Sequence, residues 1–206
     1  MNESYPLTYS VEYPDRDLDR LTSFFRIFTV IPILIVLATV NHYVFGGWGD
    51  RATAYAGAGG ILFLGPLLMI LFRQKYPRWW FDWNRELLRF SLRVHTYLAL
   101  MSDTYPSTDE QQWVQLEIEY PNVETDLSRG MPLVKWFLAI PHYIVLFFLG
   151  VGAFFAVIFA WFAILFTGRY PRGLFDYVLG VQRWGLRVAA YAFLLVTDEY
   201  PPFSLQ

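Results

Sequence analysis

The stretch that decides the fold is residues 136–168, WFLAIPHYIVLFFLGVGAFFAVIFAWFAILFTG, which contains no Asp, Glu, Lys or Arg. As one α-helix it would measure about 50 Å at about 1.5 Å per residue, which exceeds the roughly 30 Å hydrocarbon core of a bilayer. We expect a break at Gly150-Val151-Gly152, which leaves two transmembrane helices of about 18 residues each. The alternative is one long tilted helix whose protruding end exposes Phe, Ile and Leu.

Two more apolar stretches, 27–49 and 52–72, lie in the N-terminal half, and only Asp50 and Arg51 separate them. Each approaches the length of about 20 residues that a membrane-spanning helix needs. The sequence therefore predicts four spans, in one transmembrane hairpin at about 24–73 and a second at about 132–168.

The composition excludes most water-soluble classes. Hydrophobic residues make up 55% of the 206 residues and charged residues 17%, against roughly 45–50% and about 25% in an ordinary globular domain. The aromatic content of 20% suits a large membrane–water boundary. The net charge of -2 argues against a nucleic-acid partner. The absence of cysteine excludes disulfides, thiolate metal sites and iron–sulfur clusters.

The apolar stretches lie inside an internal repeat. Glu12-Tyr13-Pro14 recurs as Glu119-Tyr120-Pro121, and Tyr76-Pro77-Arg78 recurs as Tyr170-Pro171-Arg172. Other matched positions are Arg26 with Lys135, Arg89 with Arg183, Arg93 with Arg187, Tyr97 with Tyr191, and Asp103 with Asp198. We therefore expect repeat A at residues 1–107 and repeat B at residues 108–206.

Each repeat continues from its hairpin into a segment with helical periodicity, at about 79–101 and about 174–196. The first has a basic polar stripe and tryptophans at its start, which is typical of a helix lying in the headgroup layer. The second is more apolar, so an interfacial, buried or re-entrant path stays open. Alternation at 7–13 and 115–120 predicts short β-strands that pair with each other or join the Asp-x-Tyr-Pro tails in a small sheet.

The predicted fold class is an all-α integral membrane protein with two parallel hairpin repeats, each followed by a cytoplasmic amphipathic helix, and short strands in the cytoplasmic layer. Two spans per repeat would return the chain to its starting side. Basic residues gather before and after each hairpin, so the positive-inside rule places both termini in the cytoplasm.

Two sets of residues are candidates for binding or packing. The pairs Arg89/Arg93 and Arg183/Arg187 have i,i+4 spacing, so each pair points one way from its helix and could bind lipid phosphates or an anionic ligand. The alternative is that they pair with Asp82, Asp176 or helix-terminal carbonyls, or simply meet headgroups. Small residues of the predicted hairpin would allow close helix packing, namely Gly57, Gly59 and Gly60.

The sequence contains no clear motif for catalysis or for binding a cofactor or a metal. His42 and His142 lie in apolar stretches, where paired histidines can hold haem, but they are not equivalent in the repeat and packing explains them better. The predicted spans carry no acidic residue, which argues against ion-coupled transport. Serine-elbow, zinc-helix and phosphate-loop motifs are absent. We therefore expect no enzymatic activity, no cofactor and no metal.

The order of strand, hairpin, Tyr-Pro-Arg-x-x-Phe-Asp, amphipathic helix and Asp-x-Tyr-Pro resembles the bacterial membrane family catalogued as domain of unknown function 4389. Residues 169–203 carry the closest match, and 75–106 carry a weaker second copy in which Pro106-Ser107 replaces Pro-Pro-Phe. The resemblance implies a multi-pass protein of the bacterial inner membrane, in two tandem copies, and brings no established activity.

The function that we expect is that of a non-catalytic accessory or scaffolding subunit of a larger membrane complex. Its partners would be membrane lipids and other integral membrane subunits. The alternatives are a protein that binds a lipid or a lipophilic ligand and, as the weakest, a small-solute transporter.

Overall fold

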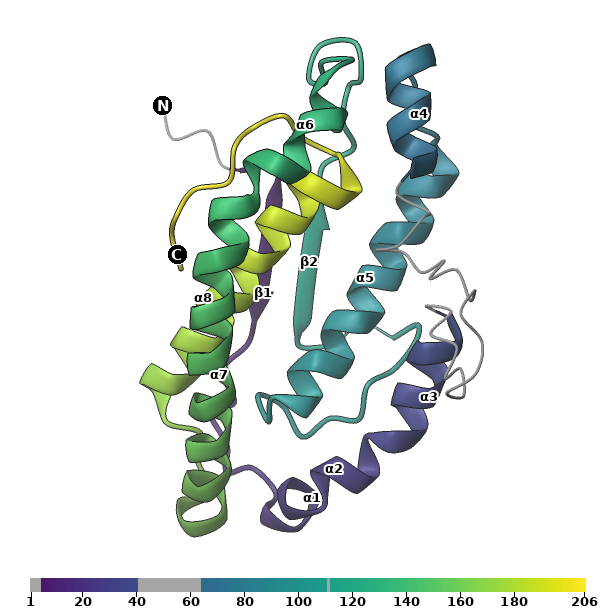
Figure 1. The fold of residues 1–206 in the computed structure, drawn as a ribbon. Helices are drawn as coiled ribbons and strands as arrows, with labels where there is room; N and C mark the ends of the chain where they lie inside the picture. The colour runs from purple at the N-terminus through teal and green to yellow at the C-terminus, as the bar shows by residue number, and fades with distance from the viewer. Residues whose placement is uncertain (1–4, 41–63, 111) are drawn as a thin grey trace, which may run out of the picture.

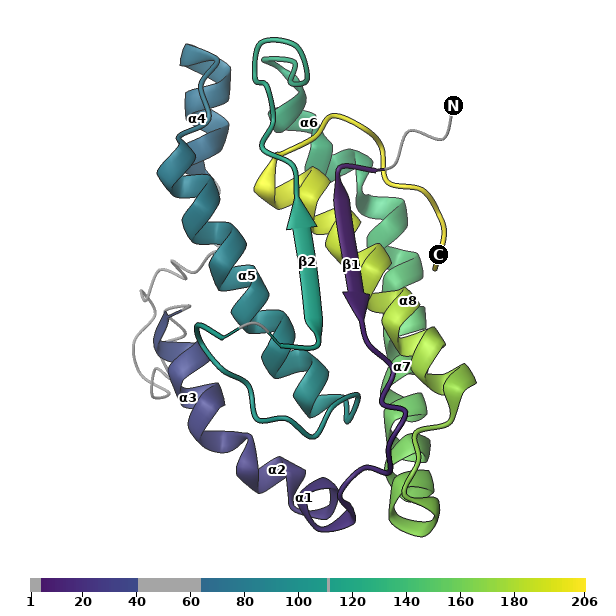
Figure 2. The ribbon, with the colours of Figure 1, turned by 180° about the vertical axis from the view of Figure 1, so that it is seen from behind.

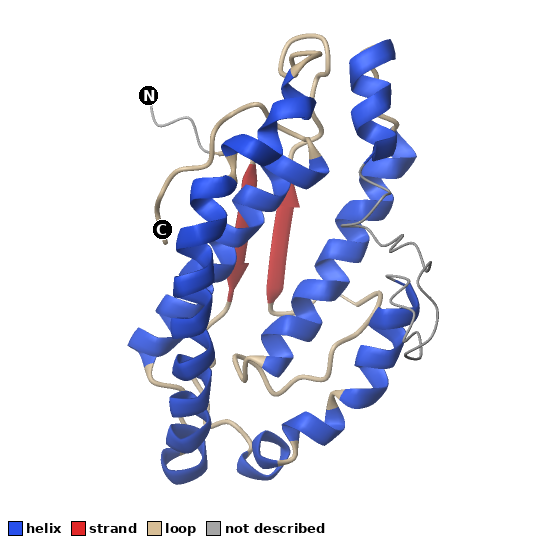
Figure 3. Cartoon of the chain, viewed as in Figure 1, coloured by secondary structure: helices blue, strands red, loops and turns tan. Residues whose placement is uncertain are grey.

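The computed structural model of the chain describes residues 5–40, 64–110 and 112–206. Helices make up most of this part, beside a small two-stranded sheet, as predicted (Figure 3). In chain order the elements of Figure 1 are β1 Leu7–Val11, α1 Arg20–Phe24, α2 Arg26–Thr29, α3 Ile31–Val40, α4 Leu64–Arg73, α5 Arg78–Leu98, β2 Val114–Ile118, α6 Met131–Leu138, α7 Ile140–Thr167, α8 Arg172–Ala189 and the π-helix η2 Ala190–Leu194.

An antiparallel ribbon of β1 and β2 lies between the longer helices, and Figure 2 shows it in front of α8. Tyr9 and Leu116 are opposite each other at the middle of the ribbon. Alternate residues of both strands are buried, except the half-buried Val114, and those between them are exposed, so one face of the ribbon packs on protein. α8 packs against β1 and α5 packs against β2.

The two amphipathic helices end in the same way. α5 ends before Leu100, which has φ of 62°, and η2 ends at Leu195, which has φ of 58°. A residue in this left-handed conformation stops a helix and turns the chain out of it. The helices therefore lie within the predicted ranges of about 79–101 and 174–196 to within a turn, with α8 and η2 dividing the second.

The helix α7 is continuous over 28 residues, about 42 Å at about 1.5 Å per residue. The predicted break at Gly150-Val151-Gly152 is therefore wrong, and the alternative of one long helix describes the structure. Gly152 serves close packing, because a Cβ atom there would lie 2.5 Å from the hydroxyl oxygen of Tyr177 on α8. The helix stops at Gly168, whose φ of 78° is left-handed.

Within the described residues one helix, α7, is long and apolar enough to cross a membrane. The prediction of four spans is therefore wrong for this part of the chain. In the N-terminal half the structure has the shorter apolar helices Arg26–Val40 and Leu64–Arg73. The remainder of the predicted first hairpin, residues 41–63 with Gly57, Gly59 and Gly60, lies outside the described residues.

The helix α7 has two unlike faces. On the packed face Ala156, Ala160 and Ile164 are buried at intervals of four residues, and α8 runs beside them. The opposite face exposes a row of phenylalanines, namely Phe147, Phe148, Phe155, Phe159 and Phe166. Exposed apolar surface of this extent marks a contact with lipid or with another protein.

Candidate functional site

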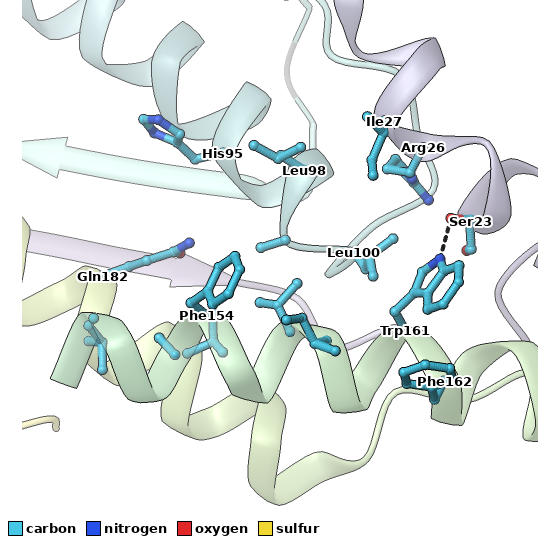
Figure 4. A pocket seen from close by; sticks show the side chains of 17 residues that line it. Ser23, Arg26, Ile27, His95, Leu98, Leu100, Phe154, Trp161, Phe162 and Gln182 are labelled. Carbon is cyan, nitrogen blue, oxygen red and sulfur yellow. Dashed lines mark hydrogen bonds between the residues drawn. The ribbon is translucent and has the colours of Figure 1, made fainter. Parts of the chain in front are cut away.

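A cavity of about 790 Å³ lies where α1, α2, the end of α5, α7 and α8 meet (Figure 4). This volume is within the range of about 300–1,000 Å³ that is usual for small-molecule sites. The longest part of the wall is on α7 and consists of Gly150, Ala153, Phe154, Val157, Ile158, Trp161 and Phe162. The remaining apolar wall comes from Ile27, Leu98, Ala99, Leu100, Val178 and Val181.

Polar side chains border this cavity at two ends. Figure 4 shows Arg26 and Ser23 close to Trp161, and His95 and Gln182 at a distance from them. The indole Nε1 of Trp161 donates a hydrogen bond to the carbonyl oxygen of Ser23 at 3.1 Å, which joins α7 to α1. The cavity therefore has an apolar middle between two different polar ends.

Arg26 is 2% exposed, and its guanidinium group is only partly bonded. Nη1 donates to the carbonyl oxygen of Ser102 at 2.8 Å, and the guanidinium carbon lies 3.8 Å from the ring centroid of Tyr97. Nε and Nη2 are buried without a hydrogen-bond partner among the described residues, and so is the hydroxyl of Ser23. Buried charged groups in proteins are ordinarily paired, so this arginine is an exception.

The carboxylates nearest to Arg26 are occupied elsewhere. Asp103 accepts a hydrogen bond from the Arg16 guanidinium group and another, at 3.4 Å, from the backbone N–H of Asp19. Asp19 caps α1, where its side chain accepts from the backbone N–H of Thr22 at 2.8 Å. In the described part of the chain, neither carboxylate forms an ion pair with Arg26 within 4.0 Å.

The other end of the cavity is neutral. Gln182 accepts a hydrogen bond from the hydroxyl of Tyr9 at 3.0 Å, and burial raises the pKa of Tyr9 to about 12. The apolar side chains around His95 lower its pKa below the ordinary value, although the residue keeps an exposed surface. Arg26 is therefore the charged side chain of the described wall.

The four arginines that the sequence predicts as ligands bond to the protein backbone. From α5, Arg89 donates to the carbonyl oxygen of Leu116 through Nε at 3.1 Å and Nη2 at 2.9 Å. From α8, Arg183 donates through Nε to the carbonyl oxygen of Tyr9 at 2.8 Å. Because Tyr9 and Leu116 are register partners, these two arginines hold the middle of the ribbon from both sides.

Arg93 and Arg187 bond to the segments that follow their own helices. Arg93 donates to the carbonyl oxygen of Ser107 at 3.0 Å, and Arg187 donates to that of Ser204 at 3.3 Å and to that of Gln206. The described wall of the cavity includes none of the four predicted arginines. We therefore place the candidate site at Arg26, which the sequence offered only as one member of a matched pair.

The described residues contain no group of three His, Asp or Glu side chains that could hold a metal ion. His142 accepts a hydrogen bond from Trp184 Nε1 at 2.9 Å and stacks on Phe203 at a centroid distance of 4.0 Å. These contacts give His142 a packing role between α7, α8 and the C-terminal segment. His42 lies outside the described residues.

Comparison with known families gives one match. The family model described as "Domain of unknown function (DUF4389)" matches residues 131–204, from α6 to the C-terminal segment. This match supports the family that the sequence resembles, with one copy matched where two tandem copies were predicted. No curated protein and no solved structure matches the chain.

Proposed function

We propose that this chain is a membrane protein that binds a lipophilic ligand in the cavity beside α7. The observation that carries the proposal is the composition of the wall. Apart from Ser23, Arg26, His95 and Gln182, the lining residues are aliphatic, aromatic or glycine. The longest stretch of this wall belongs to α7, the helix that is able to cross a membrane.

The position of the cavity favours a ligand that comes from the lipid phase. Ile27, Phe154 and Phe162 line the cavity and are nevertheless 71%, 63% and 48% exposed, so the cavity opens to the outside of the molecule. An alkyl chain that covers this wall gains about 25 cal/mol for each Å² of apolar surface removed from water. A chain-bearing molecule is therefore a better occupant than a polar solute.

A substitution that fills the cavity tests this proposal. Ala153→Trp adds a large side chain to the wall, and Ala163→Trp makes the same change on α7 outside the described wall. Each protein would be purified from native membranes in mild detergent, and its bound lipid measured by native mass spectrometry. We expect retained lipophilic molecules in the unmodified chain and in Ala163→Trp, and their loss in Ala153→Trp. Equal lipid in all three proteins would contradict the proposal.

The phenylalanine face of α7 favours a second candidate function, the accessory or scaffolding subunit of a membrane complex. In this proposal the exposed face contacts bilayer lipid or a partner subunit in the bacterial inner membrane. Cross-linking in cells from a photoreactive residue at Phe155 would give one constant partner. Cross-links to lipid alone would leave the ligand-binding proposal in place and remove the scaffolding one.

Single-cysteine labelling tests the membrane placement, and the chain has no native cysteine to interfere. Gly130→Cys precedes α6 and Gly173→Cys follows α7, and a side chain at either position meets nothing within 4 Å. If α7 spans the membrane, an impermeant reagent labels these two cysteines from opposite sides. Labelling of both from one side would show that α7 lies along the surface.

A further inference from the structure

We propose that the ligand of this cavity carries an anionic head group that binds Arg26, with its apolar chain running along α7 toward His95. This inference rests on the proposed function, because it specifies the chemical class of the lipophilic ligand. The class is an amphiphile with a carboxylate or phosphate head, whether it is a free fatty acid or an anionic membrane lipid.

Arg26 has unmet hydrogen-bonding capacity. A guanidinium group has five N–H donors, and here Nε and Nη2 are buried without acceptors in the described part of the chain. A carboxylate or phosphate accepts from two such donors at once, in charge-assisted bonds that are about twice as strong as neutral ones. The hydroxyl of Ser23, also unbonded, lies at the same end of the cavity (Figure 4).

The charge of the cavity wall also favours an anionic head group. No Asp or Glu is among the described residues that line the cavity, so an anionic head would meet no repulsion from the wall itself. The lowered pKa of His95 disfavours its charged form, so the far end competes little for the head group. The polarity of the cavity thus fixes the orientation of the ligand, with its head at Arg26 and its chain between Leu100 and Phe154.

Arg26 lies just under the surface of the wall, since its Nε and Nη2 atoms are covered. A head group reaches them when a neighbouring side chain turns aside. Binding at this end therefore requires that the side chains covering Nε and Nη2 move.

Three probes on the full-length, delipidated protein distinguish the head-group chemistry. Palmitate carries a carboxylate, hexadecanol is its neutral counterpart of equal chain length, and dioleoyl phosphatidylglycerol carries a lipid phosphate. We expect at least one of the two anionic probes to bind about tenfold or more tightly than hexadecanol, the order expected of a charge-assisted hydrogen bond. The stronger of the two identifies the source of the anion. This comparison needs no variant, so a folding defect cannot obscure it.

Variants then assign the effect to Arg26. Arg26→Gln should reduce the affinity for the anionic probe to that for hexadecanol and leave hexadecanol binding unchanged, whereas Arg26→Lys should retain part of the preference. Arg20→Gln removes the same charge from an exposed position of α1 and should change neither affinity.

The outcomes separate this inference from the function on which it rests. Equal binding of all three probes would overturn the anionic head group and keep the lipophilic site. An anion preference that survives Arg26→Gln would overturn the role of Arg26. Failure of every probe to bind the unmodified chain would contradict the proposed function itself.

Discussion

Arg26 and Lys135 occupy matched positions in the two halves of the chain, and both are buried cations. Lys135 donates to the carbonyl oxygen of Thr197 at 2.6 Å and forms an ion pair with Asp198 at 2.7 Å. Arg26 donates to the carbonyl oxygen of Ser102 at 2.8 Å but has no such carboxylate. Ser102 and Thr197, whose carbonyl oxygens accept these two hydrogen bonds, also occupy matched positions. The two cations therefore differ in the ion pair alone.

The missing ion pair has a visible cause. Asp103 matches Asp198 in the sequence, but in the structure it bonds to Arg16. The cation of the second half is thus neutralised inside the protein, while that of the first half borders a cavity. One half therefore has a completed buried pair, and the other half has an incompletely bonded cation beside a cavity.

Lys135→Met should destabilise the protein most, because it leaves the Asp198 carboxylate without its cation. Removal of one partner from a buried ion pair destabilises a protein by about 3–5 kcal/mol. Chemical denaturation in detergent would measure this loss, and the double variant Lys135→Met with Asp198→Asn should recover part of it. A loss below about 1 kcal/mol would show that the pair is not a buried one.

Arg26→Met should be less destabilising, because no paired carboxylate is left behind. The loss is limited to the hydrogen bond to Ser102 and the contact with Tyr97, about 1–3 kcal/mol in the free energy of unfolding. Arg20→Met, at an exposed position, is the control. If Arg26→Met and Lys135→Met cost the same, the contrast between the two halves is wrong.

Where the two halves make equivalent hydrogen bonds, substitutions at matched residues should lower the free energy of unfolding by the same amount. The hydroxyl of Tyr13 donates to the carbonyl oxygen of Tyr170, and that of Tyr120 to the carbonyl oxygen of Tyr76, both at 2.5 Å. Tyr13→Phe and Tyr120→Phe should each lower the free energy of unfolding by about 1 kcal/mol. Clearly different midpoint temperatures of thermal unfolding for the two variants would contradict this equivalence.

The smallest effect concerns pH. His95 lines the cavity, and the matched position in the second half is Ala189. Desolvation lowers the pKa of His95 in the folded state, although the residue is exposed, so the unfolded chain takes up the proton first and stability should fall slightly as the pH drops below about 6.5. His95→Gln should flatten this fall. An unchanged pH profile of stability would mean that His95 is not desolvated at the wall.

Local patterns in the sequence predicted much of the fold. The alternation at 7–13 and 115–120 gave the ribbon strands, and helical periodicity placed α5 and α8 with η2. These elements follow from side-chain spacing along one segment, which a sequence displays directly. The predicted break at Gly150-Val151-Gly152 was wrong because a glycine in a helix can either break the helix or admit a close contact from another element. Here Gly152 admits the hydroxyl of Tyr177, a contact made by a residue of another helix.

Local patterns in the sequence could not predict the candidate site. The wall of the cavity combines residues of α1, α2, α5, α7 and α8, which meet only in the folded chain. The i,i+4 spacing predicts the arginines as ligands of a phosphate, but a backbone carbonyl oxygen also accepts hydrogen bonds from a guanidinium group. In the structure, strand carbonyls hold Arg89 and Arg183. The one available signal for Arg26 was its match with Lys135 at the start of an apolar stretch.

The most direct test of the central claim is photo-cross-linking in native membranes with a diazirine-bearing palmitate, read out by mass spectrometry of the labelled residues. A ligand inside the cavity predicts adducts on residues of the cavity wall that are not themselves exposed, such as Leu100 and Val157. Excess unlabelled palmitate should suppress these adducts. Adducts confined to the outward phenylalanines Phe147, Phe159 and Phe166 would show lipid around the protein only, and would contradict the claim that this cavity binds a ligand.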